Sequence, residues 1–212
     1  MGDTPEPPGS PPRRTRWTTL GAPRRATIGV VTDDLVHVGG EDLRYCPRCG
    51  APLVVRLIET EDRPRLICDR GHILYVNPVL VVGVIPERRG RILLLRRAIE
   101  PRRGFWTYPG GFMEIDETVE ECAAREAHEE VGVSVRVLDL IGVYSRPGPH
   151  PGPGIVSIVY RGTVAAGRPH ISREALEARW FRPDDIPWDE LAYETTGWAL
   201  SDWVEHRRKT SS

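Results

Sequence analysis

The sequence has almost no lysine, few cysteines and no long apolar run. Lys209 is its only lysine, and 29 basic residues nearly balance 30 acidic ones, giving a formal net charge of -1. This balance argues against a nucleic acid held by bulk charge. No apolar stretch approaches the roughly 20 residues that span a bilayer, and the N-terminus lacks the apolar core of a secretory signal. We therefore expect neither a membrane nor a nucleic-acid partner.

The four cysteines are too few and too unevenly spaced for a disulfide framework. A reducing, cytoplasmic location fits this usage best. A length of 212 residues suits one domain or a small pair of domains.

Composition divides the chain into three parts. Residues 1–25 are rich in Pro, Arg, Gly and Ser, which predicts a disordered tail. Residues 41–76 form a cysteine-containing module, and residues 77–208 carry the alternating patterns of a larger domain. The order and type of the expected strands and helices predict an α/β fold, with a mixed sheet and helices packed on it.

In the larger domain, apolar periodicity predicts each element. Residues 79–85 and 91–96 read as a hairpin, and residues 104–111 as a loop with a turn at Gly110–Gly111. A helix begins near Thr118, where Glu121 completes a capping box, and stops at Gly132. Further strands are expected at 134–143, 155–164 and 179–181, and a last helix at 195–208, with Trp198 and Trp203 on its apolar side.

The helix that ends at Gly132 has carboxylates on its core-facing side. On a helical wheel, Glu126 and Glu130 fall within about 20° of Val119, near the centre of an apolar stripe, and Glu129 lies at its edge. A solvated acidic helix is the alternative, but it does not explain acids that face a core. Converging carboxylates near a core are costly unless a cation neutralises them. Oxygen ligands at this spacing favour Mg²⁺ or Mn²⁺.

Residues 111–133 resemble the Nudix box, which is Gly, five residues, Glu, seven residues, then Arg-Glu-U-x-Glu-Glu-x-Gly-U, with U aliphatic. The one departure is Ala127, which is smaller than the usual residue. The resemblance implies a Nudix α/β/α sandwich that hydrolyses a pyrophosphate with divalent ions. It also implies roles for particular residues. The glutamates Glu126, Glu129 and Glu130 would carry the ions together with the carbonyl of Gly111, while Glu117 and Arg125 would pair to brace the loop against the helix.

The catalytic base does not transfer with this resemblance, since the family draws it from varied places. Glu174 and Glu177 are candidates from position alone. Ordinary exposed charges are an equally good interpretation of both.

The cysteine module has the form of a zinc knuckle. Cys46 and Cys49 stand two residues apart with Gly50 next, and Cys68 is followed by His72 in place of a fourth cysteine. We predict a structural Zn²⁺ on these four residues; a degenerate ribbon without metal is the alternative. Cys122, in the middle of the helix, is expected to be a small core residue.

A zinc ribbon ahead of a Nudix domain resembles a subgroup acting on FAD and ADP-ribose. Arg96 and Arg97 are candidate phosphate ligands. NADH-preferring relatives carry a Ser-Gln-Pro-Trp stretch where this chain has Tyr144-Ser-Arg-Pro147. We therefore expect a small-molecule nucleotide substrate, ADP-ribose or FAD, with AMP released. A broader nucleotide-sugar or dinucleotide hydrolase that includes NADH, a non-catalytic ligand sensor and a homodimer stay open.

Overall fold

The computed structural model describes residues 37–38, 41–59, 61–147 and 154–210. The expected tail at 1–25 and residues 148–153 of the proline-rich loop lie outside this range. The described residues divide into two units. The smaller takes those up to Val79 with residues 147 and 154–155, and the larger takes residues 80–146 and 156–210.

The smaller unit is built from short strands. Two of them, β1 (His37–Val38) and β2 (Glu41–Asp42), pair antiparallel. The other three, β3 (Leu53–Arg56), β4 (Arg65–Cys68) and β5 (Ile73–Leu74), form an antiparallel sheet with Leu53 opposite Cys68. The apolar side chains buried here are Cys46, Leu66 and Cys68, so little besides the cysteines forms a core.

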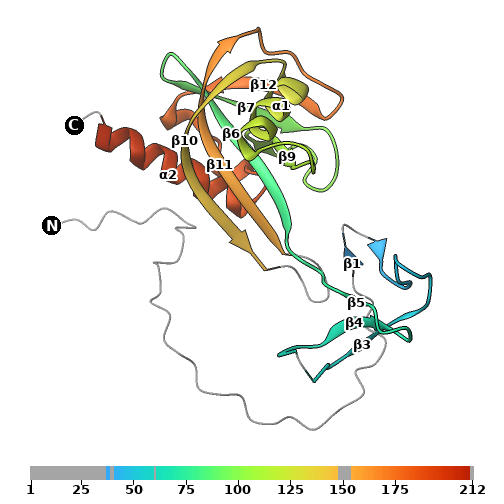
Figure 1. Cartoon of the computed structure of the whole chain (residues 1–212). Helices are drawn as coiled ribbons and strands as arrows, with labels where there is room; N and C mark the ends of the chain where they lie inside the picture. Colours follow the sequence, from blue (N-terminus) through green and yellow to red (C-terminus); the bar gives the residue numbers. More distant parts are fainter. Residues whose placement is uncertain (1–36, 39–40, 60, 148–153, 211–212) are drawn as a thin grey trace, which may run out of the picture. The chain divides into compact units, whose positions relative to one another are not determined.

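The larger unit is built on one sheet whose main strand order is β10-β11-β6-β7-β12 (Figure 1). These strands are β6 (Val79–Arg88), β7 (Arg91–Arg97), β10 (Ser134–Arg146), β11 (Ile155–Ala166) and β12 (Ala175–Phe181). Two short strands complete it: β8 (Trp106–Thr107) pairs with β7, and β9 (Gly110–Phe112) pairs with β6.

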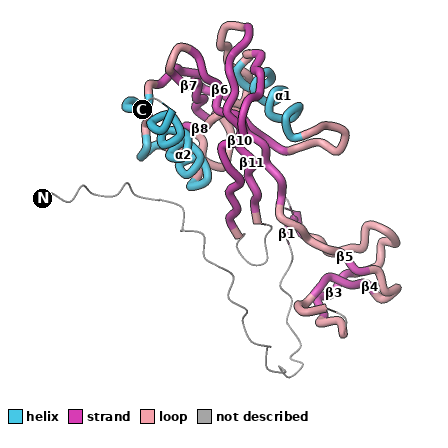
Figure 2. The backbone as a smooth tube through the Cα atoms, turned by 60° about the vertical axis from the view of Figure 1, so that its left-hand side comes forward, coloured by secondary structure: helices cyan, strands magenta, loops and turns pink. Residues whose placement is uncertain are grey.

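A helix covers each face of this sheet (Figures 1 and 2). Along β7, Ile92 and Leu94 pack toward α2 (Glu194–Thr210), where Trp203 is fully buried. Leu93 and Leu95 pack instead toward α1 (Val119–Val131). Burial on both faces explains why β7 is a continuous apolar run, and each buried leucine contributes about 2 kcal/mol.

The expected α/β/α sandwich is confirmed, but the loop expected at residues 104–111 is wrong, because this segment contains β8 and most of β9. Gly110 and Gly111 lie in strand β9 and form no turn. A Cβ on Gly110 would lie 2.7 Å from the Cα of Gly83 on β6, so the two backbones approach closely because both residues lack side chains. Strand β12 begins at Ala175, four residues earlier than expected. Two 3₁₀ turns, Pro183–Asp185 and Trp188–Glu190, connect it to α2. In the described parts of the chain, no helix combines the length and apolarity needed to cross a membrane.

Candidate functional site

Helix α1 is fixed at both ends by local interactions. The Thr118 hydroxyl accepts a hydrogen bond from the Glu121 amide at 3.2 Å, and the Glu121 carboxylate accepts one from the Thr118 amide at 2.8 Å. This is the predicted capping box. At the other end Gly132 is left-handed, with φ at 66°. The register of the acidic residues between them is therefore set by the sequence itself.

The acidic residues of α1 differ in burial as the helical wheel predicts. The Glu126 side chain is 12% exposed and Glu130 is 8% exposed, whereas the Glu129 side chain is 58% exposed. Cys122, Ala123 and Ala127 are fully buried beside them. Two carboxylates thus face the interior from a helix whose apolar stripe packs on the sheet.

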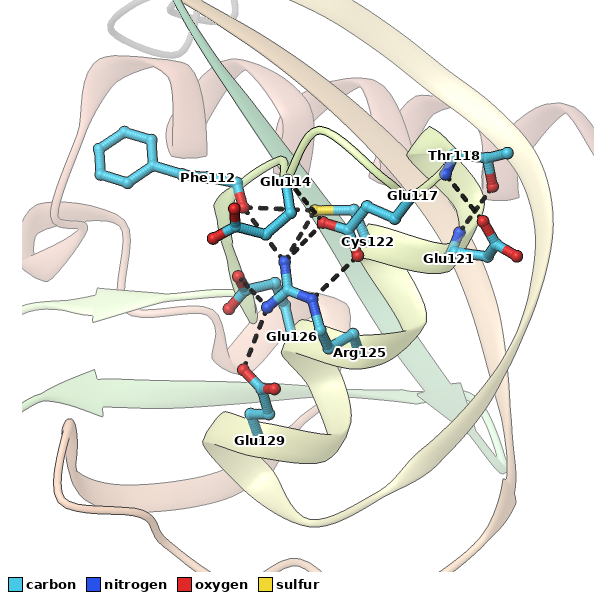
Figure 3. Close-up of polar contacts among 9 residues, drawn as sticks. All are labelled: Phe112, Glu114, Glu117, Thr118, Glu121, Cys122, Arg125, Glu126 and Glu129. Atoms are coloured by element: carbon cyan, nitrogen blue, oxygen red, sulfur yellow. Dashed lines mark hydrogen bonds and ion pairs between the residues drawn. The ribbon is translucent and has the colours of Figure 1, made fainter.

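Arg125 is the centre of a hydrogen-bond network with backbone and side-chain partners (Figure 3). Its Nε and Nη2 donate to both carboxylate oxygens of Glu117 at 2.9 and 2.7 Å, and Nη2 also donates to the Phe112 carbonyl at 3.1 Å. Its Nη1 donates to Glu126 at 2.8 Å and to Glu129 at 3.1 Å. The structure therefore brings Glu117 and Arg125 together, and the Arg125 guanidinium lowers the pKa of Glu117 to about 2.

Glu130 is held apart from this network. Its carboxylate accepts a hydrogen bond from the Gly110 amide at 2.9 Å. Burial raises the pKa of Glu130 to about 8, and that single hydrogen bond offsets only part of the desolvation. The short strand β9, which sequence patterns did not predict, supplies this amide.

Gly111 lies directly against Glu126. A Cβ at position 111 would be 2.5 Å from Oε1 of Glu126, so a side chain there would displace the carboxylate. Burial also raises the pKa of Glu126, although Arg125 works against it. The glycine of the motif therefore leaves room for the position that this carboxylate takes beside Arg125.

The three glutamates do not converge on one point in this structure, because Arg125 holds Glu126 and Glu129 while Glu130 binds Gly110. The donor set nevertheless fits a hard divalent cation. Two carboxyls with pKa values raised by burial carry a desolvation cost that a cation would offset, and all the donors are oxygens.

A loop before β12 carries Glu174 to this site. The Ser172 amide donates to the Glu130 carbonyl at 3.2 Å, and the Glu174 amide donates to the Ser172 hydroxyl at 3.1 Å. After burial, the negative charge of Glu174 is among the causes that raise the pKa of Glu126 and of Glu130. Glu177 instead lies 3.8 Å from Arg179. Sequence patterns could not distinguish these two glutamates, whereas the tertiary contacts favour Glu174.

The two candidate phosphate ligands are anchored to the loop after β7. Arg96 donates from Nε to the Gly104 carbonyl at 2.7 Å, and Arg97 donates from Nε to the Pro101 carbonyl at 3.0 Å. The positive charge of Arg97 also acts on Glu130 and lowers its pKa, against the larger effect of burial. Arg97 is therefore the one of the pair that the electrostatics connect to the acidic site.

A second cluster lies in the smaller unit, where the ligand atoms of four side chains lie within 4.8 Å of one another. Cys46 Sγ is 3.6 Å from His72 Nδ1, and Cys49 Sγ is 3.8 Å from Cys68 Sγ. Tetrahedral bonds of about 2.3 Å to sulfur and about 2.05 Å to nitrogen give edges of about 3.8 Å for S–S and about 3.6 Å for S–N. The four side chains therefore fit a zinc ion. Cys122, outside the cluster, is a buried core residue as expected.

The comparisons with known proteins agree with both features. Residues 76–203 match the NUDIX domain family and residues 44–76 match the Nudix N-terminal zinc-ribbon family. An ADP-ribose pyrophosphatase from Methanocaldococcus jannaschii is 39% identical over 121 residues, which are 57% of this chain and 70% of that protein. The NAD-capped RNA hydrolase NudC of Salmonella heidelberg is 30% identical over 145 residues, or 68% of this chain but only 53% of that protein.

Among solved structures, a NUDIX hydrolase from Nitrosomonas europaea aligns with a TM-score of 0.72 and 37% identity. The alignment covers 79% of this chain and 93% of that one.

Proposed function

Because the chain belongs to the Nudix hydrolase family, we propose that it hydrolyses the pyrophosphate of ADP-ribose and of related ADP-linked compounds such as FAD, releasing AMP. The likeness to the M. jannaschii ADP-ribose pyrophosphatase supports the substrate class. The observation that carries the reaction class is the pair of buried carboxylates, Glu126 and Glu130, beside β9.

We assign the divalent ions, Mg²⁺ or Mn²⁺, to Glu126, Glu129, Glu130 and the carbonyl of Gly111. When bound, such ions neutralise the charge of the pyrophosphate and polarise its phosphorus. Glu117 has a positioning role, because its two hydrogen bonds to Arg125 tie the loop before α1 to the helix. Arg97, whose charge reaches Glu130, is the proposed phosphate ligand, and Arg96 is the weaker candidate.

Glu174 is the proposed general base. In the step we assign to it, the carboxylate takes a proton from water as the water oxygen bonds to a phosphorus. The bond from that phosphorus to the bridging oxygen breaks, and the bridging oxygen leaves on the other phosphate. The products from ADP-ribose are AMP and ribose 5-phosphate. Two observations support Glu174 in this role. The negative charge of Glu174 acts on both buried glutamates, Glu126 and Glu130, and the Glu174 carboxylate is exposed to solvent, so water can reach it.

Replacing Glu174 by Gln tests this assignment against the matched change Glu177→Gln. Loss of a general base removes about 100-fold or more of the rate. We expect kcat to fall by that amount in Glu174→Gln. Glu177→Gln should stay within a few-fold of wild type. A folded Glu174→Gln enzyme with normal kcat would exclude this residue as the base.

Substrate preference is tested by competition among ADP-ribose, FAD and NADH at equal, sub-saturating concentrations. The three share an ADP half, so discrimination comes from contacts with the other half. We expect kcat/KM for ADP-ribose or FAD to exceed that for NADH by at least about tenfold, or roughly 1.4 kcal/mol. The match to NudC makes dinucleotide hydrolysis the second candidate. Preferential consumption of NADH would establish it and leave the reaction class unchanged.

The thiol and imidazole cluster is proposed to hold a structural zinc ion. Hydrogen bonds within the loop Cys46–Gly50 support this, since the Cys49 and Gly50 amides donate to the Cys46 carbonyl at 3.3 and 2.8 Å. Burial raises the pKa of Cys46, but hydrogen bonds from the backbone of Arg48, from Cys49 and from His72 bring it down to about 6. A thiolate, the form that binds zinc, is thus favoured at neutral pH.

A further inference from the structure

A cavity of about 530 Å³ lies at the end of the sheet where the β6–β7 hairpin meets the end of β12. Arginines dominate its lining, with Arg88, Arg89 and Arg91 on the hairpin and Arg182 after β12. The half-buried ring of Trp180 forms part of the wall, and Asp184 is the one acidic residue in the lining. The volume is in the range of small-molecule sites.

The register of the strands forces these arginines together. Arg88 and Arg91 are directly opposed in the antiparallel pair, where like charges are destabilising. Strand alternation places Arg91 on the same face as Leu93, and Arg182 on the same face as Trp180. Both Leu93 and Trp180 pack on the α1 side of the sheet, so the guanidinium groups share that side.

The four arginines are exposed to solvent and are not neutralised by acidic neighbours. Across the described ranges, Arg88, Arg89, Arg91 and Arg182 form no ion pair within 4.0 Å, although Asp184 lines the same cavity. The positive φ of Arg89, 50°, is what the two-residue turn Arg89–Gly90 requires, so the hairpin itself fixes where this arginine lies. Their positive charges are therefore available to an anionic ligand.

The cavity does not belong to the candidate active site. Arg91 begins β7 and Arg97 ends it, and Arg97 is the residue whose charge reaches Glu130. Likewise Glu174 precedes β12, whereas Arg182 follows it. Six or seven strand residues separate the two ends, or about 20 Å at roughly 3.3 Å per residue.

We propose that this arginine cavity binds a nucleoside triphosphate at a second site, distinct from the site of hydrolysis. Guanidinium groups bind phosphate oxygens in bidentate pairs, and several phosphates in a row would relieve the repulsion between Arg88 and Arg91. The indole of Trp180 offers a flat apolar wall for the base. Binding at this cavity does not depend on which substrate the catalytic site takes.

The test is calorimetric titration of the full, zinc-loaded chain with ATP and with inorganic tripolyphosphate, at about 100 mM salt and with no Mg²⁺ or Mn²⁺ added, so that metal-dependent binding at the glutamates is suppressed. Wild type should bind both, with quenching of tryptophan emission by ATP. The double variant Arg88→Gln/Arg182→Gln should bind each at least tenfold more weakly. Arg136→Gln, which removes an exposed charge on β10, is the matched control and should bind normally.

Two more variants locate the binding. Trp180→Phe keeps an aromatic ring in the core and should remove the quenching, while Glu126→Gln at the candidate active site should bind ATP like wild type. If the double glutamine variant fails to fold by circular dichroism, Arg88→Lys/Arg182→Lys keeps both charges without the bidentate geometry and should still weaken binding several-fold. No binding by wild type at 1 mM ATP would overturn the proposal. So would normal binding by a folded arginine variant, loss of binding in Glu126→Gln, or binding of an RNA oligonucleotide without binding of ATP.

Discussion

Replacing Glu130 by Gln should stabilise the metal-free protein at neutral pH while it abolishes most of the activity. Burial raises the pKa of Glu130 from 4.5 to about 8 in the folded protein. Between these values the unfolded chain has lost its proton and the folded chain retains it, so stability falls as pH rises, by about 1.4 kcal/mol per unit. From pH 5 to pH 7 this residue alone lowers the free energy of unfolding by about 2–3 kcal/mol.

A glutamine at this position cannot ionise but can still accept the Gly110 hydrogen bond. We therefore expect urea unfolding of the zinc-loaded protein without added Mg²⁺ or Mn²⁺, followed by tryptophan fluorescence, to show a shallower pH dependence for Glu130→Gln than for wild type. Glu129→Gln is the matched control, since the Glu129 side chain is 58% exposed, and it should keep the wild-type slope.

With Mg²⁺ or Mn²⁺ present, activity of Glu130→Gln should fall by about 100-fold or more, as when one electrostatic group is removed from a catalytic site. Near-normal turnover, full wild-type activity in excess EDTA, or identical stability–pH slopes for wild type and Glu130→Gln would each refute the reasoning.

Three further predictions concern the rest of the chain. Purified protein should carry about one zinc per chain, measured by elemental analysis. Cys49→Ser should lose the zinc and unfold more readily, while the turnover of its folded fraction changes less. The control Cys122→Ala should retain the zinc. Gly132→Ala should lower the free energy of unfolding by at least about 1–2 kcal/mol in urea titrations, because φ is 66° and a Cβ would lie 1.9 Å from the His170 ring. Deleting residues 1–25 should leave kcat/KM within a few-fold of the full-length value, since their composition offers almost nothing to bury. Wild type purified without zinc, an unchanged stability of Gly132→Ala, or a large loss of kcat/KM on deletion would contradict the respective expectation.

The acidic helix was predictable from sequence because its geometry is local. Residues three and four apart share a helix face whatever surrounds them, and the cap at Thr118 and the stop at Gly132 fix the phase. The wheel therefore separated the inward Glu126 and Glu130 from the outward Glu129, and the observed exposures agree. The clustering of Cys46, Cys49, Cys68 and His72 was predictable for a similar reason, since each cysteine of one pair lies within four residues of its neighbour in sequence and Cys68, at the end of β4, is followed closely by His72.

The partners of those carboxylates were not predictable, because they come from distant strands and loops. The Gly110 amide reaches Glu130 only because the glycine pair Gly83 and Gly110 lets β9 approach β6, and a Gly-Gly sequence reads equally well as a turn. Glu174 reaches the site through the loop whose Ser172 amide binds the end of α1.

The same limit applies to the arginine cavity. In sequence, Arg88-Arg89-Gly90-Arg91 is a charged turn, and no local pattern indicates that Arg182 lies beside it. The antiparallel pairing of β7 with β12, in which Phe181 lies opposite Ile92, is what carries Arg182 to the hairpin. Local patterns thus identify the residues that can do chemistry, whereas strand pairing decides which of them meet.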